Sequence, residues 1–162
     1  MTDESVHILE EASTLLAECR TASLATVDDD GRPHAVNIQY VHDDRLRLYF
    51  VSSEDAAHSL QALVIPDVAV TVYHHDDTQP GTIRGLQLHG RLSAVTDERE
   101  QDSALTQYLS KFSFIANSHK LRGAVERQTL YRFTPSWFRL IDNRRGFGWK
   151  AELPWDNPAD EI

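Results

Sequence analysis

The stretch that decides the fold is TIRGLQLHGRLSAV, residues 82–95, in which apolar and polar side chains alternate. Successive side chains of a β-strand point to opposite faces, so residues two apart share a face. One face carries the apolar residues Leu86, Leu88, Leu92 and Ala94, and the other carries Gln87, His89, Arg91 and Ser93. The pattern predicts a long strand with one face on a core and the other face polar.

Shorter strands surround this one in the sequence. Residues 22–27, 35–41 and 46–51 are β-rich segments separated by the turn sequences Asp30-Gly31-Arg32-Pro33 and Asp43-Asp44. Short turns join antiparallel neighbours, so these three segments predict a meander. Residues 68–73, 130–133 and 138–141 are rich in β-branched, aromatic and other apolar residues and predict three further strands.

Helical spacing occupies the intervals between the strands. Residues 5–19 repeat apolar side chains three and four apart, which predicts an amphipathic helix. Residues 56–65 predict a short helix, with Ser52 or Ser53 as a hydroxyl cap and Pro66 as its end. A third helix is expected from Asp97 to about Phe112, followed by an irregular or helical stretch to Gly123. The fold class is therefore mainly β (β+α), with six or seven antiparallel strands and two or three peripheral helices.

Composition limits the classes of partner. The 162 residues carry a formal net charge of −9, which argues against nucleic acid as a partner. No apolar run approaches the roughly 20 residues of a membrane span, and the single cysteine, Cys19, excludes an internal disulfide. We expect one cytoplasmic domain over residues 1–153 and a flexible acidic tail over residues 154–162, which holds two prolines and three acidic residues.

Five blocks of sequence, taken in order, resemble the first five strands of a known family. They are Ser23-Leu24-Ala25-Thr26-Val27 with Asp30-Gly31-Arg32-Pro33, then residues 48–53 (LYFVSS), 63–70 (LVIPDVAV) and 84–90 (RGLQLHG). Their succession is similar to the FMN-binding split barrel of the pyridoxamine 5'-phosphate oxidase family. Residues 138–150 look more like another branch of that superfamily than like the vitamin-B6 oxidase itself. The resemblance implies a split β-barrel, a homodimer packed barrel to barrel, and FMN in a groove at the subunit interface.

The resemblance places the phosphate of FMN near Ser52 and Ser53, which precede the short helix. Free N–H groups at a helix N-terminus favour an anion, so the residue chemistry agrees. Where the oxidase family carries an Arg-Lys pair, this chain has Ala57 and His58. One titratable imidazole thus replaces a double fixed charge. The alternative is that Ser52 only caps the helix and that His58 only faces solvent.

The long strand supplies candidates for the flavin ring. Gly85 leaves room for close approach, and Gln87 on the same face offers both a donor and an acceptor to the ring edge. Arg84 points the opposite way by strict alternation, so a phosphate contact from it needs a bulge or the subunit edge. Asn37 lies on the strand that runs along the ring in this family. The alternative for Gln87 is an ordinary solvated sheet face.

A basic and aromatic group that includes Arg144, Arg145, Trp149 and Lys150 follows the last predicted strand. In the family this region reaches over the partner's flavin, and a plain basic turn is the alternative. No metal-ligand spacing occurs among the eight histidines, and no side chain stands out as a catalytic acid or base. The leading hypothesis is an FMN-dependent oxidoreductase acting on a small-molecule substrate. The alternatives are a non-catalytic dimeric small-ligand-binding module, or a haem- or deazaflavin-binding relative.

Overall fold

The structure is a computed structural model that describes residues 2–155. Its helices are α1 (Asp3–Glu18), α2 (Ala57–Val64), α3 (Glu98–Lys111), α4 (Ser113–Ala116) and α5 (His119–Glu126), with a short 3-10 helix η1 (Asn143–Arg145). Its strands are β1 (Thr21–Val27), β2 (Pro33–Gln39), β3 (Val41–His42), β4 (Leu48–Ser52), β5 (Asp67–His74), β6 (Arg84–Ala94), β7 (Thr129–Asp142) and β8 (Lys150–Pro154). None of the helices within this range is both long and apolar enough to cross a bilayer.

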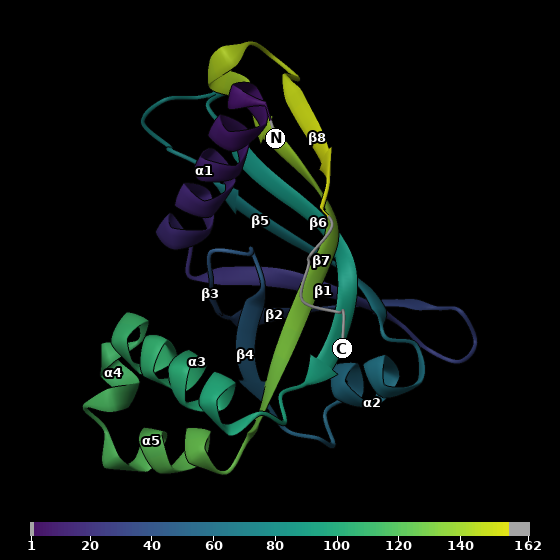
Figure 1. Cartoon of the computed structure of the whole chain (residues 1–162), viewed down its shortest axis with the longest axis vertical. Coiled ribbons are helices and arrows are strands. Elements are labelled where there is room, and N and C mark those ends of the chain that lie inside the picture. Colours follow the sequence, from purple (N-terminus) through teal and green to yellow (C-terminus); the bar gives the residue numbers. More distant parts are fainter. Residues whose placement is uncertain (1, 156–162) are drawn as a thin grey trace.

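One antiparallel sheet holds the strands in the order β2-β1-β5-β6-β7-β4-β3, and β8 pairs with β7. The long strand β7 organises this sheet. It pairs with β6 along its length, with β4 over residues 129–133 and with β8 over residues 137–141. The curled sheet with its helices is a β+α split barrel, which confirms the predicted fold class (Figure 1).

A β-bulge interrupts the pairing of β6 with β7. His89 lies opposite Trp137 and Gly90 lies opposite Pro135, so Ser136 is an extra residue on β7. A Cβ atom on Gly90 would lie 2.1 Å from the carbonyl oxygen of Thr134, so only glycine fits there. Pro135 explains why the sequence predicted two strands where the structure has one: its missing N–H falls at the irregularity and not within a regular ladder.

Two hydrophobic clusters form the core. The larger one lies within the curled sheet and includes the buried stripe of α1, formed by Ile8, Ala12, Leu15 and Leu16. The predicted apolar face of β6 belongs to it through Leu86, Leu88 and Leu92, whereas Ala94 is exposed. The smaller cluster joins the start of β7 and the β3–β4 hairpin to α3 and α4, around Phe112 and Tyr108.

The helices α3, α4 and α5 form a single excursion between the neighbouring strands β6 and β7 (Figure 1). Where the chain leaves and returns, the amide of Val95 donates to the carbonyl oxygen of Leu130 at 2.9 Å. The structure thus has five α-helices within residues 2–155, where the sequence predicted two or three. The additional ones, α4 and α5, occupy the stretch that was predicted to be irregular or helical.

The strand β8 was not among the predicted strands. Its residue Pro154 pairs with Trp137, and the amide of Trp155 donates to the carbonyl oxygen of Ser136 at 3.0 Å. The indole nitrogen of Trp155 donates to the carbonyl oxygen of Arg45, also at 3.0 Å. Residues 154 and 155 of the predicted tail therefore contact the barrel. Residues 156–162 lie outside the described part of the chain.

Candidate functional site

The first group of predicted site residues comes together where β4 ends and α2 begins. Ser52 is the last residue of β4 and His58 is the second residue of α2. Their side chains meet with 2.8 Å between Oγ and Nε2. The imidazole also packs against the ring of Phe50, and burial lowers its pKa below the usual value. A neutral imidazole and a hydroxyl are thus paired beside the helix.

The N-terminus of α2 has no side-chain cap. Its N-cap residue is Ala56, and no side chain bonds to the first-turn amides. The prediction that Ser52 or Ser53 caps this helix is therefore wrong: Ser52 turns to His58, and Ser53 accepts from the amide of Asp55 at 3.3 Å. Uncapped amides, a hydroxyl and an imidazole are together a set of donors suited to an anion.

A row of polar residues crosses the outer face of the sheet, each one opposite the next on a neighbouring strand. In order across six strands it consists of Asn37, Ser23, Thr71, Gln87, Arg139 and Glu152. We call it the polar row. Ser23 donates to the Asn37 side-chain oxygen at 3.0 Å, and Arg139 donates to the Gln87 side-chain oxygen at 3.2 Å. Within residues 2–155 neither side-chain NH₂ group has an acceptor, so Asn37 and Gln87 both retain donors.

Small residues flank parts of the polar row on both sides. On one side Ala35, Ala25 and Ala69 lie opposite one another and lead to His89, whose ring stacks on Trp137 at 4.6 Å between centroids. On the other side lies Gly85, where an added Cβ would meet only the carbonyl oxygen of Val72 at 3.7 Å. Packing inside the described chain therefore does not require glycine at residue 85.

Arg84, Arg145 and Trp149 lie at the opposite end of the barrel, against α1. Arg84 pairs with Asp142 at the end of β7, whereas Ser52 pairs with Thr129 at its beginning. Arg84 forms an ion pair with Glu18 at 2.5 Å. Arg145 forms one with Glu11, also at 2.5 Å, and lies over the ring of Trp149 at 4.4 Å. Within the chain these three residues are therefore separate from the Ser52–His58 pair.

Sequence reasoning missed four of the six residues of the polar row: Ser23, Thr71, Arg139 and Glu152. The first three lie at alternate positions of predicted strands, so the side of the sheet was readable from the sequence. The register between strands was not readable, and it is the register that lines the residues up. Glu152 was missed because β8 itself was not predicted.

Comparison with known proteins agrees with this architecture. The family model described as pyridoxamine 5'-phosphate oxidase matches residues 8–142. No curated protein matches this sequence. Three of the similar solved structures come from different bacteria. A heme-binding protein from Mycobacterium smegmatis has a TM-score of 0.74 and 17% identity, and the match covers 90% of this chain and 57% of that one. This chain thus spans little more than half the length of that protein.

The other two are shorter proteins. A heme storage protein from Vibrio cholerae has a TM-score of 0.62 and 24% identity, with 78% of this chain and 88% of that one covered. A FAD-binding protein from Mesorhizobium loti has a TM-score of 0.62 and 22% identity, with 80% and 90% covered. At these identities the structural likeness shows the fold alone. With the match over residues 8–142, the chain belongs to the pyridoxamine 5'-phosphate oxidase family.

Proposed function

We propose that the protein is an FMN-binding oxidoreductase that works as a homodimer, with the cofactor at the subunit interface. The observation that carries the proposal is the Ser52–His58 pair beside the uncapped start of α2. A phosphate monoester accepts hydrogen bonds through three oxygens, and this corner offers a hydroxyl, an imidazole and free amides. The FAD-binding relative of similar fold supports a flavin as the ligand.

The outer face of the sheet fits the planar part of such a ligand. Asn37 and Gln87 retain amide donors for the polar edge of a ring, and Gly85 leaves space at the surface. Once bound, the flavin would supply hydride or electron transfer, and the chain would supply position and electrostatics. Arg84, Arg145 and Trp149 lie near the end of β7, whereas Ser52 pairs with its beginning, so they cannot share a ligand with Ser52 in one protomer. In the proposed dimer they would approach the partner's ligand.

Comparing FMN with riboflavin, which lacks the phosphate, tests the phosphate assignment. In a fluorescence titration the Ser52→Ala/His58→Ala variant should bind FMN at least tenfold more weakly and bind riboflavin as the unaltered protein does, since charge-assisted bonds contribute roughly 1.5–3 kcal/mol. Ser110→Ala/His119→Ala is the matched control, because it makes the same changes at two exposed residues on α3 and α5, away from this corner. Failure of the unaltered protein to bind FMN at micromolar concentration would overturn the proposal.

A gain-of-function variant tests the same site from the other direction. Ala57→Arg/His58→Lys restores the basic pair that the oxidase family carries and should tighten FMN binding, again without changing riboflavin binding. A size-exclusion measurement with and without FMN tests the homodimer. A monomer that binds FMN tightly would refute the interfacial location.

Haem is the second candidate, favoured by one specific observation. His89 is exposed on the outer face of the sheet with its ring stacked on Trp137, so an imidazole is presented beside an aromatic wall. Two proteins of similar fold are described as heme-binding and heme storage proteins. Haem bound through His89 would give a Soret band that shifts in His89→Ala. FMN would give flavin absorption unaffected by that substitution.

A further inference from the structure

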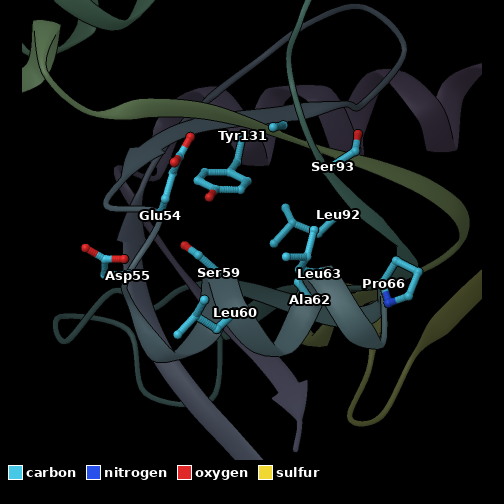
Figure 2. A pocket seen from close by; sticks show the side chains of 11 residues that line it. Glu54, Asp55, Ser59, Leu60, Ala62, Leu63, Pro66, Leu92, Ser93 and Tyr131 are labelled. Atoms are coloured by element: carbon cyan, nitrogen blue, oxygen red, sulfur yellow. The ribbon is translucent and has the colours of Figure 1, made fainter.

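A pocket of about 560 Å³ lies between α2, the end of β6 and the beginning of β7 (Figure 2). Neither Ser52 nor His58 lines it, so it is distinct from the proposed phosphate site. Its volume is within the range of about 300–1,000 Å³ that is typical of small-molecule sites. The pocket therefore has the size to bind a ligand of its own.

The walls of this pocket are mainly apolar, and the charges at its edge have one sign. Leu63, Leu92 and Tyr131 supply apolar surface, and the ring of Tyr131 is backed by Phe50 at 5.7 Å between centroids. Glu54 and Asp55 are the charged members of the lining, and none of its described residues is Lys, Arg or His. A negative ligand would be repelled, and a positive one attracted.

One buried polar atom inside the pocket has no partner. Ser59 is 5% exposed, and its Oγ forms no hydrogen bond within residues 2–155. Figure 2 shows its hydroxyl on the pocket side of α2, directed toward Tyr131 and Glu54. A buried hydroxyl without a partner is destabilising, so a ligand that supplies a donor or acceptor here would gain affinity.

The carboxylate of Glu54 is held in place from outside the pocket. Thr129 Oγ1 donates to Glu54 Oε1 at 2.9 Å, which fixes the side chain against the start of β7. Ordering a carboxylate in advance lowers the entropic cost of pairing it with a ligand. A hydroxyl acceptor and a preordered carboxylate thus flank the same apolar space.

We propose that this pocket binds an organic ammonium ion with an apolar body. The ammonium group donates to the carboxylates of Glu54 and Asp55 and to Ser59 Oγ. The apolar body packs against Tyr131 and Leu92. The assignment does not rest on the FMN proposal, since neither Ser52 nor His58 lines the pocket.

Three probes of the same shape and different charge test this assignment: 2-phenylethylamine, 2-phenylethanol and 3-phenylpropionate. Binding to the full chain is followed by NMR chemical-shift titration of backbone amides. We expect the amine to bind at least tenfold more tightly than the alcohol, the carboxylate not to bind, and the shifts to centre on residues 54–63 and 92–94. Equal affinity for amine and alcohol, shifts centred elsewhere, or no binding of the amine would overturn the proposal.

Variants separate the ammonium site from a general effect of charge. Glu54→Gln/Asp55→Asn should weaken amine binding at least tenfold and leave alcohol binding unchanged. Asp29→Asn/Asp44→Asn is the matched control, because it removes the same charge from two exposed turn residues and should change amine affinity less than twofold. Ala94→Phe, an exposed lining position, should weaken both ligands by filling the pocket. Full amine affinity in Glu54→Gln/Asp55→Asn would refute the pairing.

Discussion

Replacing Gly90 by alanine should destabilise the barrel far more than the same change at Gly85 on the same strand. The new Cβ at residue 90 would lie 2.1 Å from the Thr134 carbonyl oxygen and 2.8 Å from Pro135 Cα, both backbone atoms of β7. Relief requires β6 and β7 to separate locally. Overpacking of this kind costs about 1–3 kcal/mol, and loss of one or two ladder hydrogen bonds adds about 1 kcal/mol each. We expect a loss of about 3 kcal/mol or more.

Gly85→Ala is the matched control, since its Cβ would make only an ordinary contact of 3.7 Å. Its free energy of unfolding should stay within about 0.5 kcal/mol of the parent or rise slightly. Urea unfolding followed by tryptophan fluorescence measures both variants, and in a thermal scan 3 kcal/mol corresponds to a fall in Tm of roughly 6–12 °C. If Gly90→Ala unfolds within 1 kcal/mol of the parent, or if the two variants lose equal stability, the close approach at the bulge is not a real constraint.

Four further predictions concern ligand binding and pH. Gly85→Ala should weaken FMN binding at unchanged stability, as measured by fluorescence titration, because the methyl group occupies space at the proposed ring site. A bound phosphate would favour protonated His58, so the parent protein's advantage in FMN affinity over His58→Ala should grow as the pH falls from 7.5 to 5.5. An advantage in FMN affinity that does not change with pH would refute the contact. Burial lowers the pKa of His42, so below pH 6.5 the unfolded chain binds more protons than the folded chain, and the free energy of unfolding falls as the pH falls. In urea titrations between pH 6.5 and 5, His42→Asn should therefore lose less stability than the parent protein. Asp142 is 2% exposed and bonds Arg144 through both carboxylate oxygens, so Asp142→Asn should lower the free energy of unfolding by about 2 kcal/mol, measured against Asp44→Asn.

The fold was predictable because its signals are local. Alternation in residues 82–95 and the spacing of α1 each report which side of one element is buried, and the structure confirms both. The limits of β7 were not predictable, because Pro135 normally ends a strand and is tolerated here only by the bulge opposite Gly90. That bulge depends on a residue some forty positions away in sequence. The strand β8 was missed because its pairing with β7 is likewise a tertiary effect.

In the candidate site, too, local features were predictable from the sequence and tertiary ones were not. Ser52 and His58 are six residues apart, and the strand-to-helix step between them was predicted, so their meeting could be anticipated. The family resemblance made Arg84 and Arg145 candidate ligand contacts, but the structure gives each an acidic partner on α1. Sequence alone does not show which charges neutralise one another when the chain folds. Such pairing decides whether an arginine is available to an anion.

The excursion that holds α3, α4 and α5 has a consequence for how the protein can change over evolutionary time. Because Val95 and Leu130 are hydrogen-bonded neighbours, residues 96–129 leave the sheet and return to it at one point. Insertions and deletions there would leave the register of β6 and β7 intact, since loop length adds little to the cost of closing a chain. Val41, Tyr49, Val51 and Leu130 tie the excursion to the strands below it through the smaller core cluster. Glu100 of α3 adds polar contacts, since it accepts hydrogen bonds from Tyr49 and Arg132. Changes in length are therefore tolerated best in the connections between α3, α4 and α5, where they leave both the barrel strands and these contacts in place.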